Sequence, residues 1–220
     1  MSLFYQHDIN QDTKLGVWHI EEPEWYFLSK VPLKRDVSHP RKRLQHLAGR
    51  FLLPSLFGDF PLADILIADT HRPYLENEQY HFSISHCGEF AAALVSRASR
   101  VGIDLEIIDE RIERIRDKFL TPVELQWARD QWAHVDTASS GTAAGTEVAM
   151  LTTLWSCKEA MFKWYGLGQV DFKRHMTLDG PILRNEDGLW LDFAFRKIQP
   201  LRLRVEVKLW DDLVLAWMVA

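Results

Sequence analysis

Two short segments of the chain carry side chains that could do chemistry together. The strand-like sequence VGIDLE contains Asp104 and Glu106, two positions apart, so both carboxylates point to one face of a strand. The helix-like sequence WSCKEAMFK contains Glu159 and Lys163, four positions apart and therefore on one face of a helix. Three carboxylates and a lysine that converge are what a divalent cation and a phosphate ester require. Together the segments predict a metal-dependent site for a phosphorylated substrate.

Each segment also has a purely structural interpretation. A strand with one face in water shows the same alternation of apolar residues with Asp104 and Glu106, and that is the more frequent cause of such a pattern. Glu159 and Lys163 could form a simple ion pair along the helix. That helix is apolar nearly all round, which predicts burial, and a buried carboxylate needs a partner. The sequence leaves open whether the partner is Lys163 or a bound cation.

A third segment, HFSISHCG, alternates as a strand and ends at Ser85, His86 and Gly88. A hydroxyl and an imidazole at this position could donate hydrogen bonds to phosphate oxygens. A nucleophilic Ser–His pair is disfavoured, because adjacent residues of a strand point to opposite faces and the flanks lack the G-x-S-x-G turn.

Composition excludes several classes of protein. Of the 220 residues, 47% are hydrophobic and nine are Trp, which is enough for a buried core. The formal net charge of −5 gives no general basic surface for nucleic acid. The two cysteines lack ligand spacing, which disfavours structural zinc and a disulfide framework. The sequence begins without the pattern of a signal peptide, and no apolar run approaches the roughly 18 residues of a membrane span. We expect a soluble, cytoplasmic protein.

Basic residues are nevertheless concentrated in one stretch. They predict either a solvated helix face or a local anion site, and Arg43 and Arg50 share a face because they are seven positions apart. The stretch comprises Lys34, Arg35, Arg41, Lys42, Arg43 and Arg50.

Periodicity predicts the elements that position these residues. Apolar spacing predicts helices from Ser38-His39-Pro40 to near Pro54, over residues 111–119, and from about Met150 to Tyr165, closed by Gly166. Thr121-Pro122-Val123-Glu124 predicts a capping box at the start of another helix. Residues 134–147 are small and polar, which predicts a flexible loop. Strands are predicted around residues 62–69, 81–86, 90–95, 101–108, 189–195, 203–209 and 213–219.

Each half of the chain therefore contains helix and several strands. This predicts an α+β fold of two similar subdomains, residues 1–100 and 101–220, of which the second contains all three carboxylates of the predicted metal site. A ligand site in the cleft between two such subdomains is a common arrangement.

Four motifs, in this order, resemble the 4′-phosphopantetheinyl transferases of the two-lobed, Sfp-like type. The match covers about residues 40–168 and also includes Leu47-Ala48-Gly49-Arg50 and the segment 118–124. Ser83 stands where Asn is frequent and Arg72 where Lys is frequent, and both keep a hydrogen-bonding or cationic group. The four motifs are Arg72-Pro73, residues 82–88 (FSISHCG), residues 102–106 (GIDLE) and residues 155–163 (WSCKEAMFK).

The resemblance implies an α+β fold with pseudo-twofold symmetry and a holo-[acyl-carrier-protein] synthase activity. Such an enzyme moves the 4′-phosphopantetheine group of coenzyme A to a serine of an apo acyl or peptidyl carrier protein and leaves adenosine 3′,5′-bisphosphate. The resemblance assigns Asp104, Glu106 and Glu159 to Mg²⁺, with Mn²⁺ as a possible substitute. Glu159, or a water on the metal, would take the serine proton, and Lys163 would neutralise charge on the transferred group.

The same resemblance implies contacts to coenzyme A. Arginine suits phosphate because its fork binds two oxygens, so Arg43 and Arg50 are candidates for the 3′-phosphate. The basic stretch 111–116 could face an acidic carrier protein or could be a solvated helix. A monomer is expected, and one sequence does not choose among fatty-acid, polyketide and peptide carriers. The other implied coenzyme contacts are Arg72, Pro73, Ser85, His86, Asp104 and Lys163.

Two further functions fit part of the pattern. A Mg²⁺-dependent phosphoesterase or nuclease would use the same three carboxylates with an activated water, but the sequence offers no second set of metal ligands. A non-catalytic protein could hold coenzyme A or a carrier without turnover. The presence of all three carboxylates and Lys163 disfavours that interpretation.

Overall fold

The computed structural model describes residues 2–32, 37–135, 146–197 and 199–220. Helices and strands are mixed along the chain, which confirms the predicted α+β class. The chain forms two compact units, one of Met1–Leu105 with Val219–Ala220 and the other of Glu106–Met218. The division falls inside strand β7 (Val101–Ile107), after Leu105 rather than after Arg100. Lys34, Arg35 and most of the loop predicted over 134–147 lie outside the described residues.

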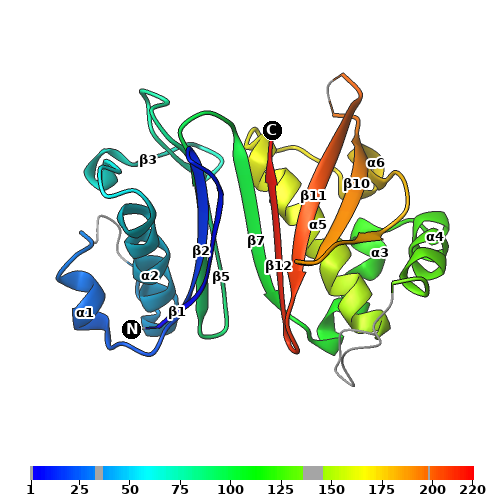
Figure 1. Cartoon of the computed structure of the whole chain (residues 1–220), viewed down its shortest axis with the longest axis horizontal. Helices are drawn as coiled ribbons and strands as arrows, with labels where there is room; N and C mark the ends of the chain where they lie inside the picture. Colours follow the sequence, from blue (N-terminus) through cyan, green and yellow to red (C-terminus); the bar gives the residue numbers. More distant parts are fainter. Residues whose placement is uncertain (1, 33–36, 136–145, 198) are drawn as a thin grey trace. The chain divides into compact units, whose positions relative to one another are not determined.

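The first unit is an antiparallel sheet with helix α2 (Pro40–Leu56) packed on one face (Figure 1). Buried residues of α2, among them Leu47, Leu52 and Leu53, form one core with apolar residues of the sheet. The strand order is β1-β2-β6-β5, from β1 (Leu3–Asn10), β2 (Thr13–His19), β6 (Phe90–Ser96) and β5 (His81–Cys87).

Helix α2 approaches strand β5 closely because residue 49 is glycine. A Cβ atom at Gly49 would lie 2.6 Å from Cγ2 of Ile84, closer than carbon atoms can pack. The helix begins as predicted at Pro40, with His39 accepting a hydrogen bond from the backbone N–H of Lys42. This close packing sets the side chains of α2 beside those of β5.

The strand predicted over residues 62–69 is wrong in extent. Residues Leu62–Asp64 form a 3₁₀ turn after Pro61, in which the N–H of Asp64 donates to the carbonyl of Pro61 at 2.9 Å. Only β3 (Leu66–Ile67) is extended, and it pairs with β4 (Pro73–Tyr74). A short helix, α1 (Glu24–Leu28), follows β2.

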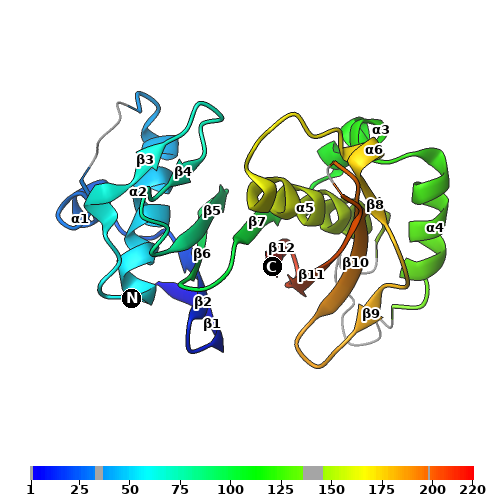
Figure 2. The same cartoon turned by 90° about the horizontal axis from the view of Figure 1, so that it is seen from above.

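The second unit has a larger sheet with helix α5 (Glu147–Tyr165) packed on it (Figure 2). Thr146 caps the start of α5, and Gly166 ends it with a φ of 71°, as its predicted role requires. The strand order is β7-β12-β11-β10-β8, with β9 paired to β10. The further strands are β8 (Met176–Leu178), β9 (Leu183–Arg184), β10 (Leu189–Phe195), β11 (Leu201–Leu209) and β12 (Leu213–Val219).

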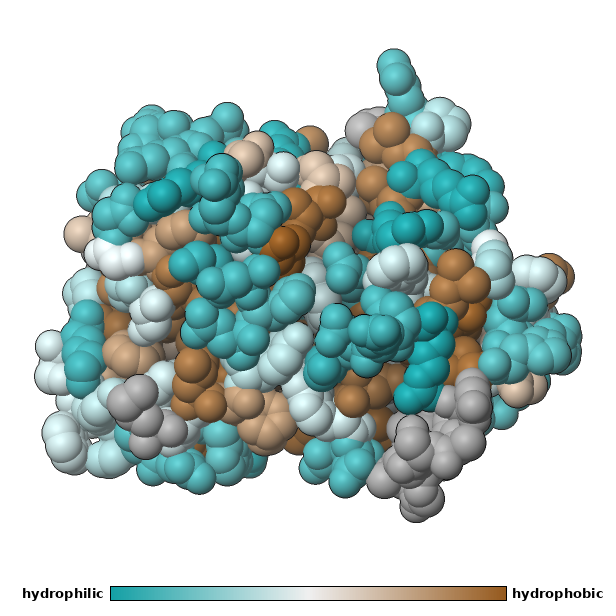
Figure 3. All heavy atoms as spheres, in the orientation of Figure 1, coloured by the Kyte–Doolittle hydropathy of each residue, from teal (hydrophilic) through white to brown (hydrophobic). Residues whose placement is uncertain are grey.

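Shorter helices complete the second unit. The helix predicted over 111–119 is a 3₁₀ helix followed by one α-helical turn, and the helix predicted from Thr121 is α4. Their bounds are η2 (Glu110–Ile115), α3 (Arg116–Phe119), α4 (Pro122–Trp132) and α6 (Phe172–His175). Hydrophilic residues are spread over the face drawn in Figure 3, with hydrophobic residues showing between them.

Candidate functional site

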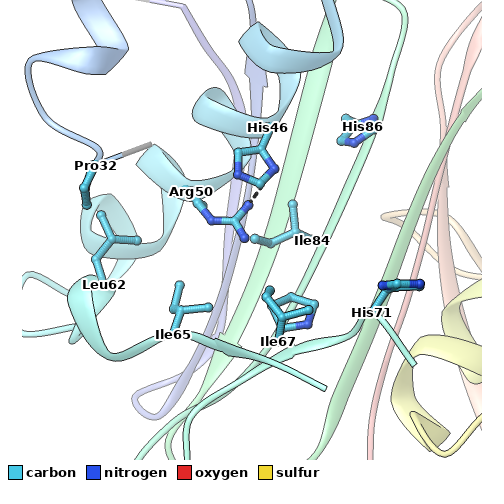
Figure 4. Close-up of a pocket in the computed structure, with 10 residues that line it drawn as sticks. Pro32, His46, Arg50, Leu62, Ile65, Ile67, His71, Ile84 and His86 are labelled. Carbon is cyan, nitrogen blue, oxygen red and sulfur yellow. Dashed lines mark hydrogen bonds between the residues drawn. The ribbon is translucent and has the colours of Figure 1, made fainter. Parts of the chain in front are cut away.

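A pocket of about 280 Å³ lies in the first unit (Figure 4). Helix α2, the β3–β4 hairpin and strand β5 supply its walls, and these walls carry three imidazoles and one guanidinium among apolar side chains. The lining residues are Pro32, His46, Arg50, Leu62, Ile65, Ile67, His71, Pro73, Ile84 and His86.

The polar groups of this pocket are hydrogen-bond donors for an anion. Nη1 of Arg50 lies 3.0 Å from Nδ1 of His46, one turn earlier on α2, and Figure 4 shows both side chains beside Ile84. His86 reaches the pocket from β5 and His71 from the hairpin. Guanidinium and imidazole N–H groups match phosphate oxygens. The structure thus brings the predicted residues Arg50, Pro73 and His86 to one pocket.

Positive charge is concentrated beside the predicted phosphate ligand Arg72. Burial lowers the pKa of Arg72, and the nearby charge of Arg100 lowers it further. Burial also lowers the pKa of His81; Glu78 opposes this shift, whereas Arg100 and Arg72 reinforce it. Since like charges disfavour one another here, an anion bound next to Arg72 would be stabilised.

Arg43 has a different environment from Arg50. Its guanidinium binds both carboxylate oxygens of Glu24 on α1, with Nη2–Oε2 at 2.9 Å, and Nη1 donates to the carbonyl of Val37 at 3.2 Å. The hydrogen bonds from Arg43 lower the pKa of Glu24. Arg43 is not among the residues that line the pocket. A phosphate at Arg43, as the resemblance implies, would have to compete with Glu24, and Arg50 is the better placed of the two arginines.

Asp104 is buried, with 3% of its surface exposed, so the half-exposed strand is the wrong interpretation for this residue. Oγ of Ser85 donates to Oδ1 of Asp104 at 2.9 Å and accepts from the backbone N–H of Leu105 at 3.2 Å. His86, the next residue, lines the pocket instead. Ser85 and His86 thus face different groups, as the alternation of a strand predicts.

Helix α5 leaves one stripe of side chains partly exposed. Between Ala149 and Tyr165, the residues that are not buried are Trp155, Glu159, Phe162 and Lys163. Their spacing of four, seven and eight positions from Trp155 puts them on one side of the helix. Glu159 and Lys163 are therefore the polar members of the one side of α5 that is not sealed in the core.

The indole of Trp155 connects this stripe to Glu106. Its Nε1 donates to Oε1 of Glu106 at 3.3 Å, and its ring packs edge-on against Phe119 with centroids 5.2 Å apart. Glu106 thus contacts the stripe of α5 through Trp155, and Glu159 lies on the same stripe one turn after Trp155.

Three carboxylates are the donor set that hard divalent cations such as Mg²⁺ and Mn²⁺ prefer. The carboxylate oxygens of Asp104, Glu106 and Glu159 are therefore ligands of the type that the implied metal requires. Asp104 belongs to the first unit, and Glu106 and Glu159 belong to the second. Within residues 2–32, 37–135, 146–197 and 199–220, no three His, Cys, Asp or Glu side chains form a ready-made metal cluster.

A buried ion pair next to the catalytic candidates was not predicted. Lys158 is fully buried, and its Nζ lies 2.8 Å from Oε1 of Glu124 and 2.7 Å from the carbonyl oxygen of Phe119. Burial lowers the pKa of Lys158, and attraction to Glu124 opposes that shift. The one available signal was a charge placed in the middle of an otherwise apolar helix, which requires a partner.

The predicted capping box is half correct. Thr121 accepts a hydrogen bond from the backbone N–H of Glu124 at 3.1 Å, as the motif requires. The carboxylate of Glu124 does not reach back to Thr121; it binds Lys158 and accepts from the N–H of Leu178 at 2.9 Å. The buried ammonium competes successfully because a charged partner in the core outweighs a surface backbone donor.

None of the helices in the described parts of the chain is long and apolar enough to cross a membrane.

Comparison with known proteins identifies relatives. The chain is 32% identical over 126 residues to enterobactin synthase component D of Escherichia coli strain K12, an alignment covering 56% of this chain and 54% of that protein. It is 23% identical over 170 residues to L-aminoadipate-semialdehyde dehydrogenase-phosphopantetheinyl transferase of Xenopus laevis, covering 70% of this chain and 55% of that protein. The chain spans about half the length of the curated relatives it matches.

A family model matches residues 100–216, a range that begins before the Asp104 strand and contains all of α5. That model describes the 4′-phosphopantetheinyl transferase superfamily. More than half of the chain, including both segments in which the chemistry was first suspected, is therefore shared with it, and the resemblance drawn from the motifs is confirmed. This chain belongs to the 4′-phosphopantetheinyl transferase superfamily.

Proposed function

We propose that the protein transfers the 4′-phosphopantetheine group of coenzyme A to a serine of an apo carrier protein. The observation that carries this proposal is the partly exposed stripe of α5, where Glu159 and Lys163 stand beside the Trp155–Glu106 contact. These are residues of the motif that the superfamily match covers. A helix buried on all other sides holds them in fixed positions, as a catalytic pair requires.

The pocket of the first unit supports binding of the coenzyme. Arg50, His71 and His86 offer donors for phosphate oxygens, while Ile65 and Ile84 offer apolar surface for a base or a pantetheine chain. Arg72, with its pKa lowered by burial and by Arg100, would gain from a neighbouring phosphate. We assign Arg50, Arg72 and His86 to the phosphates of coenzyme A, with Pro73 shaping the same pocket.

In the proposed reaction, the serine oxygen of the carrier forms a bond to the phosphorus that bears pantetheine. The bond from this phosphorus to the bridging oxygen breaks, and adenosine 3′,5′-bisphosphate leaves. Glu159 accepts the serine proton, and the ammonium of Lys163 stabilises charge that develops on the transferred group. Asp104, Glu106 and Glu159 would hold Mg²⁺ or Mn²⁺, which when bound neutralises charge on the pyrophosphate.

The partners follow from this chemistry. The nucleophile comes from an acyl or peptidyl carrier protein, and the relatives' names, a synthase component and a transferase of a dehydrogenase, support testing carriers of several classes. We place the protein in the cytoplasm, where coenzyme A and carriers occur together, and propose that it acts as a monomer without nucleic acid or membrane partners.

Intact-protein mass spectrometry tests the proposal. Apo acyl and peptidyl carrier proteins are incubated with the protein, coenzyme A and Mg²⁺, and a gain of one phosphopantetheine group is expected. Glu159→Ala should abolish the gain, because it removes the proposed base and one metal ligand. Glu147→Ala is the matched control, since Glu147 lies on the same helix but pairs with Arg129.

Other outcomes favour the other functions. Release of phosphate or nucleotide from coenzyme A without any carrier would support a phosphoesterase. Coenzyme A binding without transfer to any carrier class would support a non-catalytic binding protein. If neither transfer to a carrier nor binding of coenzyme A is observed, the proposal is contradicted altogether.

A further inference from the structure

Two serine side chains of strand β5 contact the part of β7 that belongs to the first unit, residues 101–105. In its own sheet β5 pairs with β6 and is the last strand in the order. On its other side, Oγ of Ser83 accepts from the backbone N–H of Ile103, and Oγ of Ser85 accepts from the N–H of Leu105, both at 3.2 Å. Each hydroxyl thus occupies the place of a carbonyl in a strand ladder, and the two contacts are equivalent.

Ser85 makes one contact that Ser83 does not share. Its hydroxyl donates to Oδ1 of Asp104 at 2.9 Å, in surroundings where 6% of Ser85 and 3% of Asp104 are exposed. A hydroxyl has a single proton, so a proton given to Asp104 is not available to a phosphate at the same time. A hydrogen bond to an ionised carboxylate is also among the stronger ones.

We propose that Ser85 is a positioning residue for the carboxylate of Asp104, in place of the direct phosphate contact that the resemblance implies. The proposal rests on the proposed function, in which Asp104 is a metal ligand. The backbone contact with Leu105 anchors Oγ of Ser85, and the donated proton fixes the rotation of the carboxylate about its Cβ–Cγ bond. Groups that orient metal ligands in this way commonly govern metal affinity.

Ser85→Ala and Ser83→Ala form a matched pair of variants. Both remove a hydroxyl that accepts from a backbone N–H of β7, so both should lower the thermal midpoint of unfolding, and Ser85→Ala should lower it further because it also loses the hydrogen bond to the buried carboxylate. Only Ser85→Ala removes the donor to Asp104. Differences between the two variants therefore report the contact with the carboxylate and not the contact between the strands.

The measurement is the affinity of the full-length protein for Mn²⁺ in the presence of coenzyme A, followed by electron paramagnetic resonance of the free ion. Ser85→Ala is expected to bind Mn²⁺ about 10- to 100-fold more weakly than wild type. Ser83→Ala should remain close to wild type, and Ser85→Thr, which keeps the hydroxyl, should restore affinity. In turnover, Ser85→Ala should raise the KM for Mg²⁺ more than it lowers kcat at saturating metal.

Two results would overturn the proposed role of Ser85 and leave the proposed function intact. One is equal Mn²⁺ affinity in Ser85→Ala and Ser83→Ala while Asp104→Ala binds weakly. The other is weaker coenzyme A binding by Ser85→Ala in metal-free buffer, which would indicate a direct phosphate contact. If wild type and Asp104→Ala bind Mn²⁺ equally, the proposed metal site itself fails. Should Ser85→Ala not fold, Ser85→Cys, with its weak S–H donor, replaces it.

Discussion

Arg43 and Arg50 stand on the same helix, yet their guanidinium groups have different surroundings. Arg50 lines the pocket of the first unit beside His46, whereas Arg43 binds Glu24. We expect Arg50→Ala to weaken coenzyme A binding about 10- to 100-fold, because a hydrogen bond to a charged group contributes about 1.5–3 kcal/mol. Isothermal titration of the protein with coenzyme A measures this loss.

Arg43→Ala is the control for this prediction, since it removes the same charge from the same helix. It should leave coenzyme A affinity close to wild type and lower the free energy of unfolding by about 0–1 kcal/mol, as partly exposed ion pairs do. Titration with dephospho-coenzyme A identifies the phosphate: wild type and Arg50→Ala should bind it equally if Arg50 contacts the 3′-phosphate. If Arg43→Ala and Arg50→Ala lose coenzyme A affinity equally, the two arginines do not have different roles.

At the residue scale, the sequence predicts which side chains could react but not what they touch. Asp104 alternates with apolar residues as a half-exposed residue would, yet it is buried and accepts a hydrogen bond from Ser85 of another strand. The sequence does not reveal the ion pair of Lys158, because its partner Glu124 is 34 positions away in the chain. Contacts between distant segments follow from tertiary packing, which periodicity does not encode.

At the scale of elements, the buried ammonium group of Lys158 connects α5 to neighbouring helices. Its Nζ contacts Glu124 of α4 and the carbonyl oxygens of Phe119, the last residue of α3, and Phe172, the first residue of α6. We expect Lys158→Met to destabilise the protein by about 3–5 kcal/mol, because the carboxylate of Glu124 would remain buried without its cation. Urea denaturation followed by tryptophan fluorescence measures the loss.

A double substitution shows how much of the stability lost in Lys158→Met comes from the unpaired charge of Glu124 and how much comes from altered packing. Lys158→Met with Glu124→Gln removes both charges and keeps an acceptor for the N–H of Leu178, so it should regain much of the stability lost in Lys158→Met alone. The partly exposed pair Arg129–Glu147 is the comparison, and Arg129→Ala should cost no more than about 1 kcal/mol. A double variant no more stable than Lys158→Met would show that the unpaired charge is not the cause.

Helix α5 and the strand predicted over residues 62–69 show that secondary structure is predicted best where its sequence signals are local. Helix α5 carries its signals locally, in its apolar pattern and in Gly166 with a left-handed backbone. Residues 62–69 alternate weakly, and there Pro61 begins a 3₁₀ turn that leaves only Leu66–Ile67 extended. Long periodic segments were therefore predicted well, whereas a short apolar run next to proline was not.

At the scale of the whole molecule, the candidate residues are shared between the two compact units. The pocket residues and Asp104 belong to the first unit, and Glu106 with the stripe of α5 belongs to the second. The α+β class agrees with the sequence prediction, and strand β7 runs through the division between the two units. Substitutions in the pocket, such as Arg50→Ala, and substitutions in the stripe of α5, such as Glu159→Ala, should therefore have separable effects on the binding of coenzyme A and of metal.

Coenzyme A titrations in EDTA and in Mg²⁺ test this separation in one thermodynamic cycle. If the pocket of the first unit holds the phosphates without help, wild type binds coenzyme A in EDTA and binds it more tightly in Mg²⁺. Glu159→Ala should leave the affinity in EDTA unchanged and remove the gain from Mg²⁺, whereas Arg50→Ala should weaken binding by a similar factor in both buffers. Because linkage is reciprocal, wild type should also bind Mg²⁺ more tightly with coenzyme A present, by the same factor. Weaker binding of coenzyme A by Glu159→Ala in EDTA would show instead that α5 contacts the coenzyme directly, and the two binding functions would then have to be assigned to both units together.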